Sequence, residues 1–236
     1  MIQIGLLGAS GRMGSLIAQL LKNEYSHVAH LAASMGRNDP PEHLLKTDVI
    51  IDVSTPSAMA SLATWALSSS SKLPSFVVGS TGWSPPAFKL LEQLANRTPT
   101  LISSNFSVGI YALTTLLETY SPLLRRLGYA PVITEKHHSY KKDAPSGTAL
   151  SLQKAIDPSS PNPIPIHSIR AGEIVGEHEV TFFSSGDRLT FSHQAQDRSI
   201  FARGAIDVAV WLAQKPHSTG NLLGMNDYFN SLRPLR

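Results

Sequence analysis

The sequence predicts an α/β protein in two parts, a parallel sheet covered by helices on both faces and a mixed α+β domain. Up to about residue 105, short β-branched and aliphatic runs alternate with helix-like stretches, as in doubly wound sheets. From about Phe106 the order changes to one long helix, followed mainly by strands. A final amphipathic stretch, 201–215, is expected to return to the first part.

The elements of the first part follow from periodicity. The apolar run IQIGLL (2–7) ends at Gly8, and a helix follows whose apolar residues recur at i, i+3, i+4, i+7 and i+8. These residues are Met13, Leu16, Ile17, Leu20 and Leu21. Further strands are expected at 27–34, 48–55, 75–82 and 100–105, with helices near 57–68 and 85–95.

The second part needs a sheet of its own. A long helix carrying Leu113, Leu116, Leu117 and Leu124 precedes a strand at 130–138 and a helix at 146–156. Strands are then expected at 166–174, 176–185 and 188–196, the last two joined as a hairpin at residues 185–187. The proline-rich stretch 157–166 is expected to be a loop, because a helix cannot traverse it. We therefore expect a dinucleotide-binding domain of residues 1–107 and 199–236, and a second domain of residues 108–198.

Composition excludes several classes of protein. The chain has 236 residues, 42% of them hydrophobic, and a net charge of +3 that is not concentrated in any long basic run. A nucleic-acid partner is therefore not expected, whereas an anionic small molecule is compatible. No run of about 18 apolar residues and no secretory leader is found, so we expect a soluble, cytoplasmic protein without a membrane partner. Since cysteine is absent, thiolate metal sites and thioester intermediates are excluded.

Three glycines, Gly8, Gly11 and Gly14, lie between the first strand and the first helix. Glycine allows a tight turn in which backbone N–H groups approach a pyrophosphate, and the helix N-terminus favours the negative charge. The spacing G-x-x-G-x-x-G differs from the common G-x-G-x-x-G, and a tight turn without a ligand is the alternative. The position after an N-terminal strand favours dinucleotide binding.

The second strand is expected to end at the group that reads the ribose. No carboxylate stands at the expected place in AASMGRND, although Asp39 follows a little beyond it. Arg37 suits a 2′-phosphate, so the sequence predicts a preference for NADPH over NADH.

The segment EKHHSYKKDAPSGTAL, residues 135–150, concentrates charge in a chain that otherwise has little. His137 and His138 are neighbours near the end of a strand, so their side chains point to opposite faces and do not share a metal. Histidine can exchange a proton near neutral pH, and Lys141 adds a fixed positive charge. A solvated basic loop is the alternative interpretation.

A helix is expected to begin within the same segment. After Pro145, the residues Ser146, Gly147 and Thr148 provide hydroxyls and N–H groups without intrahelical partners, which together suit a carboxylate. Ser146 can also be a simple N-cap, which is compatible with that role. Asp143 is expected to order the loop by accepting backbone N–H groups or by pairing with a lysine.

Five motifs together resemble those of the dihydrodipicolinate reductase (4-hydroxy-tetrahydrodipicolinate reductase) family. They are GASGRMG, GSTGW, SNFSVG, EKHHSYKKDAPSGTAL and RAGEIVGEH, in this order over most of the chain. The resemblance implies reduction of a small cyclic dicarboxylate with NADPH or NADH, in the diaminopimelate route to lysine. It also implies a Rossmann-like domain followed by a substrate-binding and tetramerisation domain, a homotetramer, and no metal.

The resemblance further implies individual roles. His137 matches the proton donor and Lys141 its partner, while His138, Ser146, Gly147 and Thr148 match positions that hold the substrate carboxylates. Cofactor contacts are implied at Gly8, Gly11, Arg12, Met13, Gly14, Gly79, Thr81, Ser104, Asn105 and Phe106. The chain departs from the family at Tyr140, where a histidine is frequent, and in the stretch MGRNDPPEHLLKTD, which is shorter than usual.

The sequence argues against two other classes of dehydrogenase and leaves one class of nucleotide-binding protein open. A short-chain dehydrogenase requires Tyr-x-x-x-Lys, and no tyrosine here has a lysine four residues later. An acylating semialdehyde dehydrogenase requires a cysteine. A non-catalytic Rossmann-type nucleotide sensor stays open, although a DNA-reading helix rich in arginine and lysine is not found apart from Arg125 and Arg126.

Overall fold

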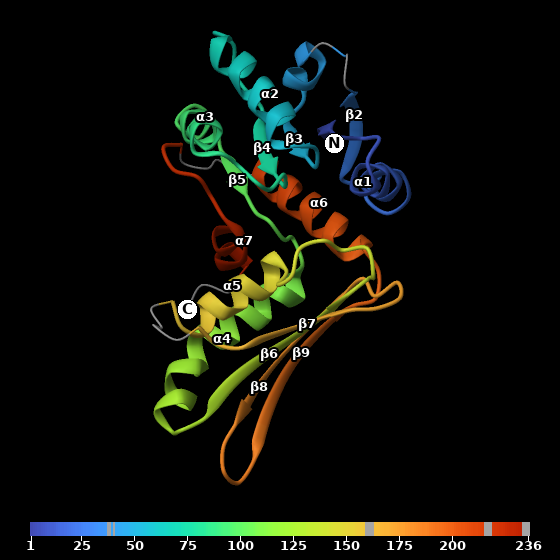
Figure 1. The fold of residues 1–236 in the computed structure, drawn as a ribbon. Coiled ribbons are helices and arrows are strands. Elements are labelled where there is room, and N and C mark those ends of the chain that lie inside the picture. The colour runs from blue at the N-terminus through green and yellow to red at the C-terminus, as the bar shows by residue number, and fades with distance from the viewer. Residues whose placement is uncertain (37–38, 40, 159–162, 215–218, 233–236) are drawn as a thin grey trace. The chain divides into compact units, whose positions relative to one another are not determined.

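A computed structural model describes residues 1–36, 39, 41–158, 163–214 and 219–232. The chain forms two compact units, residues 1–106 with 201–236, and residues 107–200 (Figure 1). The boundaries therefore fall at 106/107 and 200/201, where the sequence placed them at 107/108 and 198/199. Within the described residues, no helix combines the length and apolar composition needed to cross a bilayer.

The first unit contains a five-stranded parallel sheet in the order β2-β1-β3-β4-β5. Because β1 lies between β2 and β3, the chain direction across the sheet reverses beside β1, and ligands of such folds bind at the carboxyl ends of the strands there. The strands are β1 Ile2–Leu7, β2 Ala29–Met35, β3 Val49–Asp52, β4 Ser75–Val78 and β5 Thr100–Ile102.

Two layers of helices bury this sheet (Figure 1). On one face, α1 (Arg12–Asn23) and α6 (Ser199–Gln214) pack Ile17, Leu21 and Ile206 against the strands. On the other face, α2 (Pro56–Ser68) and α3 (Pro85–Ala95) pack Met59, Leu62 and Leu91 against the strands. The predicted doubly wound sheet and the return of the final helix to the first unit are confirmed. The sequence did not predict the 3-10 helix η1 (Pro41–Lys46) or the short helix α7 (Met225–Leu232).

The second unit has a mixed four-stranded sheet in the order β7-β6-β8-β9. β6 pairs parallel with β7 and antiparallel with β8, and β8 and β9 form the predicted hairpin. The elements are α4 Val108–Arg126, β6 Ala130–His137, α5 Gly147–Ile156, β7 Ile166–Arg170, β8 Gly176–Phe183 and β9 Arg188–Ala195. Part of the proline-rich stretch expected to be a loop, 159–162, lies outside the described residues.

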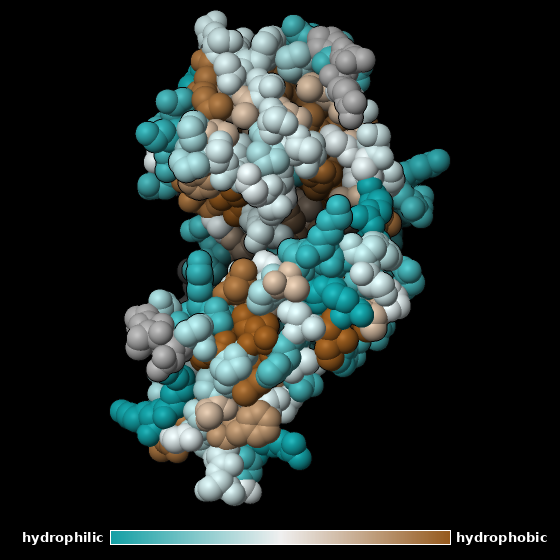
Figure 2. Space-filling view, viewed as in Figure 1, coloured by the Kyte–Doolittle hydropathy of each residue, from teal (hydrophilic) through white to brown (hydrophobic). Residues whose placement is uncertain are grey.

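Helices α4 and α5 cover one face of this sheet. Leu117 and Leu152 meet Ile133, Val180 and Phe182 in a core of fully buried side chains. Leu116, which the sequence grouped with the apolar residues of α4, is 41% exposed. In Figure 2, hydrophobic patches are visible on the surface of the second unit where α4 and α5 lie.

Candidate active site

The glycine turn after β1 is too tight for side chains. Gly8 has φ of 92°, and Gly11 donates its N–H to the Gly8 carbonyl at 3.1 Å. A Cβ on Gly14 would lie 2.2 Å from that carbonyl oxygen, so the helix can approach the turn only with glycine there. Because the N-cap, Gly11, has no capping side chain, the first N–H groups of α1 are left for a ligand.

A cavity of about 760 Å³ opens beside this turn, at the carboxyl ends of β1, β2 and β3. The predicted residues Gly8 and Gly11 line it, whereas Arg12 is exposed at the start of α1 and Met13 packs against the core. Much of the lining was not predicted from the sequence; it follows β3 and includes Ser54, Thr55, Ser57 and Ser61. Their position after a buried parallel strand was the signal, since strand ends share one edge of the sheet.

The carboxylate of Asp39, beyond the end of β2, folds back onto the residue that follows the strand. Asp39 Oδ2 accepts the N–H of Gly36 at 2.8 Å, and Gly36 and Met35 line the cavity. An acidic group here suits a ribose hydroxyl and disfavours a 2′-phosphate. Arg37, on which the expected NADPH preference depends, lies outside the described residues, so that preference stays a prediction.

A buried carboxylate joins the loops after β3 and β4. Asp52 is fully buried, and it accepts the N–H of Ser54 at 2.9 Å and the hydroxyls of Ser54 and Ser80. Burial raises the pKa of Asp52, and these hydrogen bonds oppose that rise.

The remaining predicted cofactor residues lie in the loops after β4 and β5. A Cβ on Gly79 would lie 3.0 Å from the Phe106 ring, so these two predicted cofactor positions touch. Among the others, Thr81 and Ser104 are exposed and Asn105 is half-buried.

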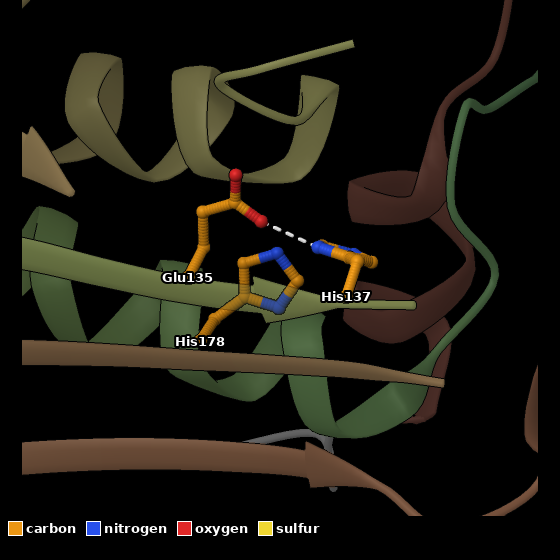
Figure 3. A group of neighbouring side chains, drawn as sticks. All are labelled: Glu135, His137 and His178. Carbon is orange, nitrogen blue, oxygen red and sulfur yellow. Dashed lines mark hydrogen bonds and ion pairs between the residues drawn. The ribbon is translucent and has the colours of Figure 1, made fainter. Parts of the chain in front are cut away.

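The strand end of the basic segment carries a buried polar cluster (Figure 3). Glu135 and His137 occupy alternate positions of β6 and therefore share one face, where His178 of β8 joins them. His137 Nδ1 is hydrogen-bonded to Glu135 Oε2, and the rings of His137 and His178 pack edge to face with centroids 5.2 Å apart. Arg170 of β7 donates to the other oxygen, Glu135 Oε1, at 2.6 Å.

The groups of this cluster differ in their protonation states. Burial raises the pKa of Glu135, but hydrogen bonds from Arg170, Ser168 and His137 outweigh burial and leave it lowered. Burial lowers the pKa of His137 below its usual value, against the opposing effect of Glu135. Burial also lowers the pKa of His178 to about 4. At neutral pH, Glu135 is thus ionised and both imidazoles are largely neutral.

Ser146 is the N-cap of helix α5. Ser146 Oγ accepts the N–H of Ala149 at 3.2 Å and is hydrogen-bonded to His178 Nε2 at 3.2 Å. Because Ser146 is only 1% exposed, its hydroxyl faces the interior, whereas Gly147 is exposed and Thr148 half-buried. The expected pairing of Asp143 with a lysine is confirmed, since Lys141 Nζ lies 2.8 Å from its carboxylate.

His138 leaves the strand and stacks on Tyr140, with ring centroids 3.8 Å apart and planes at 22°. The Tyr140 hydroxyl donates to Glu173 at 2.7 Å, which fixes the tyrosine from its other end. Tyr140 thus orients His138 by stacking.

Glu135, His137 and His178 also have the residue types of a metal site, and their ligand atoms lie within 4.8 Å of one another. However, both oxygens of Glu135 are already engaged, one by the Arg170 guanidinium and one by His137. A cation would have to displace both donors and lie beside the Arg170 charge. The arrangement therefore favours a hydrogen-bonded network over a metal centre.

A glycine cradle at the strand ends of a parallel sheet fits a dinucleotide pyrophosphate, because Gly8 and Gly14 leave the space that side chains would fill. The same chain carries a second unit in which histidines, cations and a helix N-terminus gather around one strand end. Together these features define an NAD(P)H-dependent oxidoreductase.

Comparison with known proteins identifies the family. The model described as "Dihydrodipicolinate reductase, N-terminus" matches residues 2–106, and "Dihydrodipicolinate reductase, C-terminus" matches residues 109–229. The chain belongs to the dihydrodipicolinate reductase family.

Individual relatives agree over nearly the full length. The 4-hydroxy-tetrahydrodipicolinate reductase of Rickettsia rickettsii is 36% identical over 245 residues, covering 97% of this chain and 99% of that protein. The enzyme of the same name from Campylobacter jejuni subsp. doylei is 33% identical, covering 99% and 98%. The dipicolinate-bound dihydrodipicolinate reductase of Paenisporosarcina sp. TG-14 has the same fold, with a TM-score of 0.75 at 21% identity, covering 95% of this chain and 97% of that one.

Proposed function

We propose that the chain reduces 4-hydroxy-tetrahydrodipicolinate (dihydrodipicolinate) to tetrahydrodipicolinate, in the biosynthesis of diaminopimelate and lysine. The observation that carries the proposal is a buried histidine, His137, held by a carboxylate close to a cationic loop and a capped helix start. The names of the relatives support this substrate, and the dipicolinate bound to the Paenisporosarcina enzyme is a cyclic dicarboxylate of the same kind.

His137 is the proposed proton donor, and Lys141 is its cationic partner. The electrostatic effect of Lys141 reaches His137 and lowers its pKa, as does that of Arg170. A bound dianion would oppose both cations, so it would raise the pKa of His137 and favour its protonated form. The substrate thus brings the donor to the charge state that proton transfer requires.

The carboxylates of the substrate are proposed to bind His138 and the start of α5. Gly147 and Thr148 supply the N-terminal end of the helix, where the dipole favours anions. Ser146 contributes by fixing that end through its cap to Ala149. The stack of Tyr140 on His138 restricts the imidazole to one orientation before the substrate arrives.

The nucleotide is proposed to bind the first unit, at the Gly8–Gly14 turn and the serine-rich cavity beside it. Bound NADPH or NADH supplies the hydride. Asp52 positions the loops after β3 and β4, so that Gly79 and Thr81 are presented at the edge of the sheet. The second unit is the proposed substrate-binding and tetramerisation domain.

A cytoplasmic homotetramer is part of the proposal. The second sheet exposes Phe183, Leu189 and Ile169, each more than 40% accessible, and an interface would bury such side chains. Sedimentation of the purified protein tests the assembly state, and a monomer would contradict it.

Loss of NADPH absorbance in the presence of synthase-generated substrate tests the activity. His137→Ala and Lys141→Ala should each lower kcat/KM about 10²- to 10⁴-fold. Lys142→Ala is the matched control, because Lys142 is the exposed neighbour of Lys141, and it should stay within a few-fold of wild type. A nucleotide sensor would bind NADPH without consuming it, and that result would contradict the proposal.

A further inference from the structure

Glu135 is a fully buried carboxylate that has no part in the proposed binding of substrate or cofactor. A buried charge is costly unless it is paired and hydrogen-bonded. Strand register supplies the partners, because in the parallel pair of β6 and β7 Ser168 lies beside Glu135 and Arg170 beside His137. Glu135 therefore lies between a permanent cation and the proposed proton donor.

Arg170 holds the carboxylate in place. Its Nη2 donates to Glu135 Oε1 at 2.6 Å and to the Asp143 carbonyl at 2.6 Å, so it links the strand to the loop before α5. With Oε1 bound to a guanidinium, Oε2 is left to face Nδ1 of His137. The carboxylate remains ionised under this arrangement, as the lowered pKa of Glu135 indicates.

We propose that Glu135, held by Arg170, is a positioning residue for His137, keeping a proton on Nδ1 and leaving Nε2 as the nitrogen that donates to the substrate. The inference rests on the proposed function, in which His137 is the donor. In the step itself, the Nε2–H bond of the imidazolium breaks as the reduced substrate's enamine carbon takes the proton. The neutral ring then retains the Nδ1 proton, and solvent restores the other.

The space around Nε2 of His137 is compatible with proton donation from this nitrogen. Gly176 of β8 lies beside it, and a Cβ there would be 3.2 Å from Nε2. A side chain at that position would crowd the nitrogen that has to donate. His178, whose ring packs against His137, is neutral because burial lowers its pKa to about 4, so it adds no competing charge. Among the described residues, the charged groups that shift the pKa of His137 most are Glu135, Lys141 and Arg170.

Glu135→Gln tests the proposal, because glutamine keeps the shape and reverses the hydrogen bond. Its amide oxygen can accept from Arg170 while its NH₂ donates to Nδ1 of His137, which would move the proton of the neutral ring to Nε2. Nitrogen-15 NMR of the histidines should therefore show the Nδ1–H tautomer for His137 in the wild type and the Nε2–H tautomer in the variant. The pKa of His137 should fall further in the variant, because the carboxylate that raises it is removed.

Kinetics provide the second measurement. Glu135→Gln should lower kcat at least about 10-fold and leave KM for both substrates within a few-fold, because the groups proposed to bind them are untouched. Glu179→Gln is the matched control. Glu179 is an exposed residue of β8 that accepts from Thr181, and in the described part of the chain it makes no contact with His137. It should leave tautomer, pKa and kcat unchanged.

A Glu135→Gln protein with wild-type tautomer and kcat would overturn the proposal. If the variant does not fold, the wild-type spectrum decides, because an Nε2–H tautomer for neutral His137 is incompatible with the proposed role. If His137→Ala retains full activity, the proposed donor is wrong, whereas the two NMR spectra still establish whether Glu135 sets the tautomer.

Discussion

His178 should make the second unit sensitive to acid. The imidazole is 4% exposed, and burial lowers its pKa from 6.5 to about 4. Between these two pH values the unfolded chain binds a proton that the folded protein does not, so the free energy of unfolding falls as the pH decreases from 6.5 to 4. The contribution of His178 is fully present above pH 6.5.

The size of the effect follows from the two pKa values. At pH 5 the loss amounts to about 2 kcal/mol relative to pH 7, and it approaches about 3 kcal/mol below pH 4. Glu135 adds to the acid sensitivity in the same direction, because its lowered pKa means that protonation is disfavoured in the folded state. A comparison with a His178 variant is needed to separate the two.

His178→Gln removes the titration and keeps a polar partner for Ser146. Native-state hydrogen exchange of β6 and β8 amides at pH 7 and pH 5 gives the free energy of opening for this sheet. The wild type should lose about 2 kcal/mol more than the variant between the two pH values. Equal losses in the two proteins would show that His178 is not held neutral by the fold.

Three further predictions concern other parts of the molecule. Gly14→Ala places a Cβ 2.2 Å from the Gly8 carbonyl oxygen, so the affinity for NADPH, measured by calorimetry, should fall at least about 10-fold while dicarboxylate binding is retained. An unchanged affinity would contradict the close approach of Gly14 to Gly8. Asp39→Asn removes the carboxylate at Gly36 and should raise KM for NADH more than KM for NADPH, which steady-state kinetics with each cofactor would measure. Phe182→Ala empties a fully buried position and should cost about 3–5 kcal/mol in urea unfolding, and a loss below about 1 kcal/mol would be incompatible with that burial.

The order of strands and helices could be predicted from the sequence because apolar runs and helical spacing are local signals. The ends of the strands were less predictable. The third strand was expected at 48–55 but ends at Asp52, since the residues after it leave the sheet to line the cavity. Helix α7 was missed although Met225, Tyr228, Phe229 and Leu232 recur at i, i+3, i+4 and i+7, because its eight residues are too few for the periodicity to stand out. Its buried Tyr228 packs edge to face on Trp211, with ring centroids 5.5 Å apart.

The candidate site shows the same division between local and distant information. The cap at Ser146 and the pairing of Lys141 with Asp143 involve residues close in sequence, and both were expected. Arg170 and His178 were missed because only the register of β7 and β8 against β6 brings them to Glu135. Glu135 itself could have been found, since a residue two positions before His137 on a strand shares its face.

The discontinuity of the first unit has a consequence for protein synthesis. Helix α6 supplies Ala205, Ile206 and Ala209 to the core of a sheet whose last strand ends about a hundred residues earlier. A ribosome therefore completes residues 107–200 before it releases the helix that covers the first sheet. The nascent chain exposes that apolar face in the meantime, so the first unit is completed last although its strands are translated first.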